Sequence, residues 1–347
     1  MFLLSSFCRI KNYEGVHTLP AFFDFIKLRV RYKLSVEEYL NYRFDKCGKE
    51  FRDTFLPYNK AEEYWTILNP TKNAILARDK FVGHALFNSL NIPTSELYFA
   101  FDKETYSRAN NLILHSKDQV VARIKELGIT EFVAKPAADS AHGMGVGVYR
   151  VSDFIEFGGT KLSISDLLKG KMILFESLIK QTEQIASINR SSVNTVRMMT
   201  ALYPNDEVKL MAAFIKIGRA GSCVDNAGSG GNVDCAVDIE TGELYNALQF
   251  NSWTDVQEIE KHPDSGARLN GLVIDNWQEI KAKVLDMQGR IPYLKTIGWD
   301  VALTDEGPVI IEINNWWDTT GQLFIGHGWH AEVKACYDAW RKYYQKS

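Results

Sequence analysis

The sequence predicts an α+β protein with a ligand cleft between two antiparallel β-sheets. Strand-like segments are concentrated in the middle third of the chain, at residues 172–177, 195–203 and 208–218. Helical patterns precede and follow them, and polar side chains recur near the strand ends. A chain of 347 residues is long enough to form two or three subdomains around a large core.

Helices are expected at both ends of the chain. Ser35 followed by Glu37 and Glu38 suits a helix start, and Pro93 follows the end of a later helical pattern. The expected helices cover residues 21–64, 72–90, 277–288 and 330–344. The chain is accordingly divided into an N-terminal helical segment, a lead region, a small lid subdomain and a C-terminal subdomain, at residues 1–68, 69–130, 131–185 and 186–347.

The composition indicates a globular, cytoplasmic protein. Its net charge of −3 argues against nucleic-acid binding, because no basic excess is available to displace counterions from phosphates. Its 5 cysteines are widely spaced and odd in number, which indicates reduced thiols. The opening MFLLSSFCRIKN lacks the features of a spanning helix or a secretory signal, so no export is expected. The cationic group at residues 27–33 allows at most peripheral membrane contact, and a solvated face is the simpler interpretation.

An alternating strand near the C-terminus predicts one half of a metal site. The alternation over residues 309–313 places Glu312 and Asn314 on the same face of this strand. The opposite, packed face is expected to carry Val309, Ile311 and Ile313. The plainer alternative is an amphipathic hairpin whose acids are only solvated.

The turn before this strand is predicted to bring a third ligand opposite Glu312. A three-residue turn at residues 305–307, with Gly307 at the position that favours positive φ, sets Asp300 opposite Glu312 in an antiparallel hairpin. Two carboxylates and an amide oxygen are hard ligands suited to Mg²⁺, which keeps phosphate oxygens in its remaining positions. Asp300, Glu312 and Asn314 are therefore the predicted magnesium ligands, with a nucleotide as co-ligand.

A glycine-rich hairpin in the segment EFVAKPAADSAHGMGVGVYRV is predicted to cover the phosphates of ATP. Lys135 stands at the end of a strand, and the glycines after it let backbone N–H groups approach phosphate oxygens closely. His142, Gly143 and Gly145 are assigned to nucleotide binding, with Lys80 as a second phosphate lysine. The alternatives are a flexible turn and a solvent-facing lysine.

The segment after the strand at residues 172–177 is interpreted as an adenine-binding hinge. Backbone groups of Glu176, Ser177 and Leu178 are expected to contact adenine between apolar side chains. Glu183, further along the chain, is placed in the same nucleotide-binding set.

Several donors are expected at one end of the middle sheet. Arg197 lies on an otherwise apolar strand, so it is either paired in the core or directed at a phosphate. Asn194 shortly precedes it, and Lys216 and Arg219 lie at the end of the neighbouring strand. These four are the predicted catalytic donors, which would neutralise a transferring phosphoryl group. A second glycine-rich loop at residues 225–235 either covers a substrate or is an ordinary hairpin turn.

Together these segments resemble the ATP-grasp superfamily, and within it the sugar-transfer associated, glutamate-ligase-like branch. The resemblance covers residues 70–330 and depends on RDKFVGHALFNSLNIPT, FVAKP with the glycine loop, LFESLIKQ, NTVRMMT and GWDVALTDEGPVIIEINN. It implies an ATP-grasp fold whose nucleotide cleft lies between two antiparallel sheets. The residues that it places on phosphates, adenine and magnesium are Lys80, Lys135, Arg197, Glu176, Leu178, Asp300, Glu312 and Asn314.

The resemblance also implies an activity. It suggests ATP-dependent ligation of a small-molecule carboxylate to an amine through an acyl phosphate, and it allows sugar-linked substrates of surface-glycan biosynthesis. The acceptor pocket of the family is variable and is not matched here. A kinase that phosphorylates a hydroxyl group and a non-catalytic ATP-binding scaffold are the alternatives. The sequence does not indicate the oligomeric state.

Overall fold

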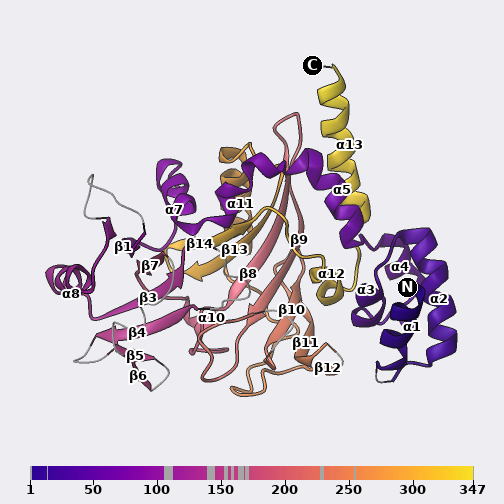
Figure 1. Ribbon diagram of the computed structural model, residues 1–347, viewed down its shortest axis with the longest axis horizontal. Helices are drawn as coiled ribbons and strands as arrows, with labels where there is room; N and C mark the ends of the chain where they lie inside the picture. The colour runs from indigo at the N-terminus through magenta and orange to yellow at the C-terminus, as the bar shows by residue number, and fades with distance from the viewer. Residues whose placement is uncertain are drawn as a thin grey trace.

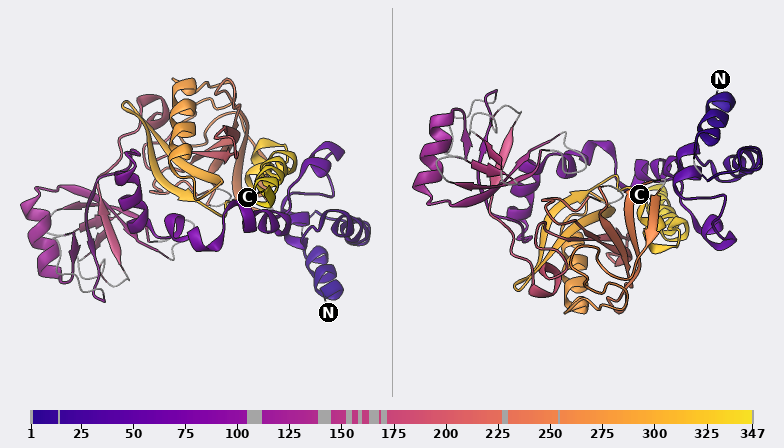
Figure 2. Two further views of the ribbon diagram at one scale, coloured as in Figure 1. Left: turned by 90° about the horizontal axis from the view of Figure 1, so that it is seen from above. Right: turned by 90° about the horizontal axis from the view of Figure 1, so that it is seen from below.

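Three parts of the molecule lie side by side along its long axis, as Figures 1 and 2 show from three directions. They are a group of N-terminal helices, a central seven-stranded sheet and another seven-stranded sheet at the opposite end. The computed structural model describes residues 2–13, 15–104, 112–138, 145–151, 155–157, 160–162, 168, 172–226, 230–253 and 255–346. The predicted α+β architecture with two sheets is confirmed.

Helices α1 to α5 form the N-terminal part. Their bounds are Phe2–Lys11 (α1), Thr18–Tyr32 (α2), Val36–Asn41 (α3), Lys49–Thr54 (α4) and Tyr58–Leu68 (α5). The predicted helix start at Ser35 is confirmed, because Ser35 and Glu38 form a reciprocal capping box. The single helical stretch expected over residues 21–64 is interrupted, first at Lys33, whose φ of 60° ends α2. None of the described helices is long and apolar enough to cross a membrane.

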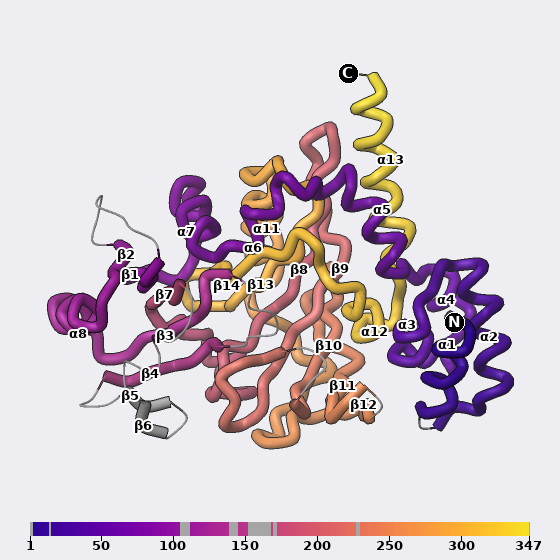
Figure 3. The backbone as a smooth tube through the Cα atoms, viewed as in Figure 1, coloured from indigo at the N-terminus to yellow at the C-terminus, as the bar shows by residue number. Residues whose placement is uncertain are grey.

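A short helical segment connects this part to the sheets. It contains a 3₁₀ turn, Thr71–Asn73, followed by α6, Ile75–Arg78, and α7, Lys80–Ser89. Figure 3 shows it passing from α5 through α6 to α7. Asp79 separates the two α-helices because its Oδ1 accepts the backbone N–H groups of Phe81 and Val82, which caps α7. The cap fixes Arg78 and Lys80 on either side of one turn.

The first sheet has the strand order β2-β1-β7-β3-β4-β5-β6. Its strands are Leu97–Phe101 (β1), Ile113–Leu114 (β2), Glu131–Pro136 (β3), Gly147–Val151 (β4), Ile155–Phe157 (β5), Thr160–Leu162 (β6) and Ile173–Glu176 (β7). All pairs are antiparallel except β1 with β2. Helix α8, Lys117–Glu126, contributes Val120 and Ile124 to the core of this sheet. Since β1 pairs with β7, the boundary expected between residues 130 and 131 falls inside one sheet.

The second sheet is antiparallel and has the order β12-β11-β10-β9-β8-β13-β14. Its strands are Thr195–Leu202 (β8), Val208–Ile217 (β9), Val233–Val237 (β10), Leu244–Ser252 (β11), Asp255–Glu258 (β12), Thr296–Thr304 (β13) and Gly307–Asn314 (β14). Its accompanying helices are Glu183–Ala186 (α10), Trp277–Arg290 (α11), Gly321–Ile325 (α12) and His330–Lys346 (α13). The predicted helices near residues 277–288 and 330–344 correspond to α11 and α13.

The alternation of β8 divides the second sheet into two faces. Val196 and Met198 belong to the core that contains residues of α11. Met199 and Ala201 belong to a second core with residues of α5, α12 and α13. Arg197 shares the face of Met199 and Ala201, so this face also presents charged side chains beyond the edge of the second core.

The hairpin of β13 and β14 confirms one part of the metal-site prediction and corrects another. Asp300 pairs with Glu312, as predicted, and Gly307 has a φ of 115°. A register shift after Asp300 interrupts the alternation, so Ile310 and Ile313 are buried while Val309 and Ile311 are only half-buried. The expected packed face was therefore wrong at two positions, because a β-bulge changes which residues face the core. The turn itself has two residues, since Gly307 already pairs with Thr304.

Gly328 allows the N-terminal helices to pack closely against the C-terminal part of the chain. A Cβ at Gly328 would overlap the carbonyl group of Thr54 and the backbone nitrogen of Phe55. Gln322 strengthens this junction, because its Oε1 accepts Leu56 N–H at 2.8 Å and its Nε2 donates to Leu56 O at 3.0 Å. The segment after α4 therefore lies directly against the one before α13.

Gly328→Ala is expected to lower the free energy of unfolding by about 1–3 kcal/mol, because rigid backbone atoms must move to admit the methyl group. The matched control is Gly289→Ala in α11, where a Cβ meets nothing within 4 Å. Alanine has the higher helix propensity, so that variant is expected to be neutral or slightly stabilised. Urea unfolding of both variants checks the prediction, and equal stabilities would contradict it.

Candidate active site

A cavity of about 1500 Å³ opens between the two sheets. Val133 and Val148 line it from the first sheet, and Thr195 and Phe214 line it from the second. Residues of the α6 to α7 segment and the segment after β14 complete its wall. This volume exceeds the range of about 300–1000 Å³ that is usual for one small ligand, so the cavity has room for more than one.

The pairing of strands in the second sheet brings four charged residues together in the wall of the cavity. Glu312 pairs with Asp300 across β14 and β13, and Asp300 pairs with Arg197 across β13 and β8. Lys216 on β9 pairs with Thr195 on β8, one step along the same face. These residues are far apart in the sequence and adjacent across the sheet.

Asp300 is held by two cations. Arg197 donates to both of its oxygens, from Nε to Oδ1 at 2.6 Å and from Nη2 to Oδ2 at 2.9 Å. Lys216 Nζ lies 3.1 Å from Oδ1. Burial opposes ionisation of Asp300, but Arg197 and Lys216 hold its pKa well below the usual range. A buried arginine needs a partner, and the structure shows that Asp300 is that partner.

The predicted metal ligands surround one corner of the cavity. Asp300, Glu312 and Asn314 all line it. The Nδ2 group of Asn314 donates to Gly298 O at 3.3 Å, which leaves its Oδ1 as the acceptor for a cation. Lys80 Nζ lies 3.6 Å from Glu312 Oε2.

The chemistry of this donor set fits a magnesium ion. In the described part of the chain, no group of three or more His, Cys, Asp and Glu side chains could hold a metal, so the amide of Asn314 is needed to complete the set. Asp300 has acceptor capacity beyond its contacts with Arg197 and Lys216, because a carboxylate offers about four lone-pair sites.

A buried ion pair lies on the opposite side of the cavity. Lys135 Nζ is 2.9 Å from Glu176 Oε2, and both side chains are buried. Ser95 Oγ donates to the same carboxylate at 2.6 Å, and His84 Nε2 lies 2.8 Å from Oε1. Burial raises the pKa of Glu176, but the Lys135 ammonium and His84 outweigh it and lower the value from 4.5 to about 2. The carboxylate of Glu176 therefore positions Lys135.

The segment that was interpreted as an adenine hinge lies beside the cavity. Ser177 N–H donates to Glu96 O at 2.9 Å, which continues the pairing of β7 with the segment before β1. Leu178 and Ile179 line the cavity after this point. Ser177 thus has a backbone partner within the protein, while Leu178 and Ile179 provide apolar contact surface.

The glycine hairpin is described in part. Gly145 has a φ of 77°, and a Cβ there would lie 2.9 Å from Cγ of Pro136. Only glycine suits this position, since both the conformation and the space exclude a side chain. Val146 and Val148 line the cavity. His142 and Gly143, which were assigned to the nucleotide, lie outside the described residues.

Two predicted site residues have other roles in the structure. Asn194 is buried in the scaffold, where its Nδ2 donates to Asn189 O at 2.9 Å and its Oδ1 accepts Gly218 N–H at 3.2 Å. Glu183 is exposed at the start of α10 and pairs with Arg190. Neither lines the cavity. The prediction placed them there because they are near Arg197 and Leu178 in sequence, but their local turns direct them elsewhere.

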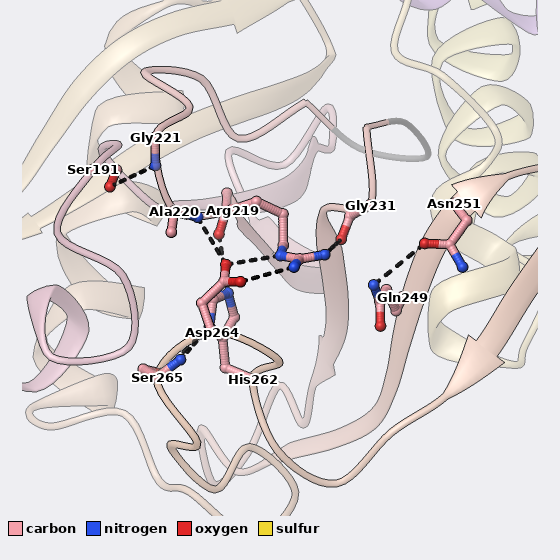
Figure 4. A network of polar contacts seen from close by, with 11 residues as sticks. Ser191, Arg219, Ala220, Gly221, Gly231, Gln249, Asn251, His262, Asp264 and Ser265 are labelled. Carbon is pink, nitrogen blue, oxygen red and sulfur yellow. Dashed lines mark hydrogen bonds and ion pairs between the residues drawn. The ribbon is translucent and has the colours of Figure 1, made fainter. Parts of the chain in front are cut away.

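Arg219 likewise has another role in the structure. It donates to both carboxylate oxygens of Asp264 at 2.7 Å, and Ala220 N–H donates to Oδ2, as Figure 4 shows. The hydrogen bonds from Arg219 lower the pKa of Asp264. Arg219 is not among the residues that line the cavity, so it connects two loops and is not placed at a phosphoryl group.

Asp225 lines the cavity and was not singled out from the sequence. Its Oδ2 accepts the backbone N–H of Thr195 at 2.8 Å and the Thr195 hydroxyl at 2.5 Å. Burial raises the pKa of Asp225, against the opposing effects of Lys216 and Thr195. The sequence feature that could have indicated Asp225 was its position as an acidic residue at the start of the second glycine-rich loop.

The chain was compared with known proteins and matches one family model. Residues 59–336 match the family model described as sugar-transfer associated ATP-grasp. No curated protein matches the chain.

Solved structures of similar fold include two N5-carboxyaminoimidazole ribonucleotide synthetases and a ligase. The first synthetase, an ADP complex, has 11% identity and a TM-score of 0.44, over 78% of this chain and 56% of its own. The second, from Thermotoga maritima, has 12% identity and a TM-score of 0.36, over 75% and 49%. The D-alanine–D-alanine ligase from Bacillus anthracis has 12% identity and a TM-score of 0.41, over 78% and 69%. The chain thus spans about half the length of the two synthetases.

Proposed function

This chain belongs to the sugar-transfer associated ATP-grasp family, and from that premise we propose that it is an ATP-dependent carboxylate–amine ligase. The observation that supports the proposal is the grouping of Asp300, Glu312 and Asn314 beside the cations Lys80, Arg197 and Lys216 in one cavity. A hard-metal donor set next to several fixed cations is what binding of a nucleoside triphosphate requires.

The nucleotide is proposed to lie along the first sheet. Leu178 and Ile179 offer apolar surface to adenine, and Lys135 offers charge to the phosphates. Lys80 lies between this region and Glu312, so it suits the end of the phosphate chain. Asp300, Glu312 and Asn314 would hold Mg²⁺, which when bound supplies a Lewis acid that neutralises phosphate charge.

The proposed reaction has two steps. A carboxylate oxygen of the first substrate forms a bond to the γ-phosphorus, while the bond between this phosphorus and the β,γ-bridging oxygen breaks and ADP leaves. The amine nitrogen of the second substrate then bonds to the acyl carbon, the carbon–oxygen bond to the phosphate breaks, inorganic phosphate leaves and the nitrogen loses a proton.

Arg197 and Lys216 are proposed to stabilise the charge that moves with the phosphoryl group. They are fixed in place before substrate binds, because both contact Asp300. The walls of the cavity would shield the acyl phosphate from water. No covalent protein nucleophile is needed for this reaction.

The substrates are proposed to be small molecules of glycan biosynthesis. The family is described by its association with sugar transfer. An amide formed between an amino acid and an acidic or amino sugar in a cytoplasmic precursor of a surface polysaccharide fits both this association and the size of the cavity.

Purified protein is expected to release ADP and phosphate from Mg-ATP only when a carboxylate and an amine are both supplied. The measurement uses coupled assays of ADP and phosphate across a panel of amino acids, uronic acids and amino sugars. The inactive control is Glu312→Gln.

Each alternative activity gives a different result in this assay. Turnover with a hydroxyl acceptor alone, without free phosphate, identifies a kinase and contradicts the ligase. ATP binding without turnover for any pair of substrates identifies a scaffold and also contradicts it.

A further inference from the structure

Two chain segments run side by side at the end of the cavity beyond the metal corner. Lys80 lies 3.6 Å from Glu312 Oε2, and Arg78, two residues earlier, lies over the ring of Trp316, with Cζ 4.3 Å from the ring centroid. Arg78 and Trp316 line the same cavity as the metal ligands. A ligand held by this pair would therefore adjoin the end of the phosphate chain.

Contacts with two buried residues hold Trp316 in place. Its Nε1 donates to Asn69 O at 3.4 Å, and its ring lies parallel to the buried ring of Trp65, at 6.2 Å between centroids and 10° between planes. Asn69 is itself buried and donates from Nδ2 to Asn315 O at 2.5 Å. Trp316 nevertheless remains 36% exposed, and it lines the cavity together with Arg78.

Arg78 differs from the other cations of the cavity in its contacts. Lys135, Arg197 and Lys216 each contact a buried carboxylate. Among the residues that the structure describes, no carboxylate lies within 4.0 Å of the Arg78 guanidinium. The cation–π contact orients Arg78 without occupying its N–H donors, which leaves a planar fork that matches a carboxylate.

Tyr58 and Asp318 complete this end of the cavity. Tyr58 is 38% exposed, and its ring lies edge-on to Trp65 at 5.5 Å. Burial raises the pKa of Tyr58, Glu62 and Asp318 raise it further, and Arg78 lowers it. One oxygen of Asp318 accepts Thr320 N–H at 2.8 Å, and Asp318 is exposed to the cavity.

We propose that Tyr58, Arg78, Trp316 and Asp318 form a subsite for a hexuronate, a pyranose sugar that carries a carboxylate. The inference rests on the proposed function, for which it names the class of one substrate. The Arg78 fork, which Trp316 orients, receives the carboxylate, the exposed ring of Tyr58 covers the apolar C–H face of the sugar, and Asp318 accepts hydrogen bonds from its hydroxyl groups.

The aromatic surface favours a sugar over a small amino acid. An amino acid could pair its two charges with Arg78 and Asp318, but it would leave the exposed ring of Tyr58 without a contact. The volume of about 1500 Å³ leaves room for a pyranose ring beside a nucleotide. Arg78 is only two residues from Lys80. A sugar held by Arg78 would therefore lie next to the end of the phosphate chain of the nucleotide.

Binding of glucuronate and galacturonate, measured by saturation-transfer NMR and calorimetry, tests the proposal. The full chain is used with Mg²⁺ and a non-hydrolysable ATP analogue, and glucose and alanine are the comparison ligands. Uronates are expected to bind at least about tenfold more tightly than glucose, since an arginine–carboxylate pair discriminates charge. Arg78→Gln is expected to remove this preference, and Trp316→Phe to reduce it, because Trp316 orients Arg78.

The control is Arg341→Gln, which removes the same charge from an exposed position on α13 that does not line the cavity. It is expected to bind uronates as the wild type does. Equal binding of uronate and glucose, tighter binding of alanine, or full uronate preference in Arg78→Gln would each overturn the subsite.

The binding assay and the turnover assay separate this inference from the ligase proposal. Uronate binding that depends on Arg78, without turnover for any pair of substrates, would support the subsite and contradict the ligase. Turnover with a non-sugar carboxylate, without any uronate binding, would support the ligase and contradict the subsite.

Discussion

Glu176→Gln is expected to lower the free energy of unfolding by about 3 kcal/mol at neutral pH. The wild-type carboxylate is buried and makes polar contacts with Lys135, His84 and Ser95. Glutamine has nearly the same shape but removes the charge that compensates the buried Lys135 ammonium. Urea unfolding at pH 7, compared with wild type, measures the loss.

The stability difference between these two proteins is also expected to depend on pH. The pKa of Glu176 is about 2 in the folded protein and 4.5 ordinarily, so the unfolded chain takes up the proton first as pH falls. The carboxylate therefore contributes its full stabilisation above about pH 4.5, and that contribution disappears as the pH falls towards 2.

The matched control for Glu176 is Glu183→Gln. Glu183 makes the same type of contact, an ion pair with Arg190, but on the exposed surface. Exposed pairs contribute little because water and salt screen them, so no measurable change is expected. A stability of Glu176→Gln equal to that of wild type, or a difference that does not change below pH 4, would show that the buried network is not stabilising.

Glu312→Gln is expected to reduce Mg-dependent ATP turnover about 100- to 1000-fold, because it removes one charged oxygen from the proposed metal site. Folding should be preserved, because this side chain is partly exposed and the substitution keeps its shape. Steady-state release of ADP measures the first effect, and thermal unfolding measures the second. Calorimetry with ADP, with and without Mg²⁺, provides a readout that does not depend on activity.

Glu306→Gln is the control for Glu312, because Glu306 is exposed in the turn of the same hairpin and does not line the cavity. Its turnover and its Mg²⁺-dependent ADP binding are expected to equal those of wild type. If Glu312→Gln retained the full Mg²⁺ dependence of ADP binding, the assignment of Glu312 to the metal would be contradicted.

The pairing of Asp300 with Glu312 could be predicted from the sequence because its information is local. Period-two alternation and a short glycine turn fix which residues of a hairpin stand opposite one another, so Asp300 and Glu312 were placed correctly. The prediction failed beside them, at Val309 and Ile311, because a β-bulge depends on how the strand fits its neighbour and leaves no clear signal in one sequence.

The choice of ionic partners could not be predicted in the same way. Arg197, Arg219 and Asn194 are close together in sequence or on neighbouring strands, and all three were expected at the phosphoryl group. In the structure Arg197 meets Asp300, Arg219 meets Asp264 and Asn194 turns into the scaffold. Each outcome depends on a partner that only long-range folding brings within hydrogen-bond distance.

The sequence by itself determined the α+β class, the family and the pairing of Asp300 with Glu312, because these follow from strand periodicity, turn chemistry and motif order. The tertiary structure decided that Glu176 supports Lys135 and that Asp225 faces the cavity. It also decided that Arg78 lies over Trp316 and that both line the same cavity as Tyr58. Burial and pairing of charges depend on residues from different elements, and their free energies are set by distances that exist only in the folded chain.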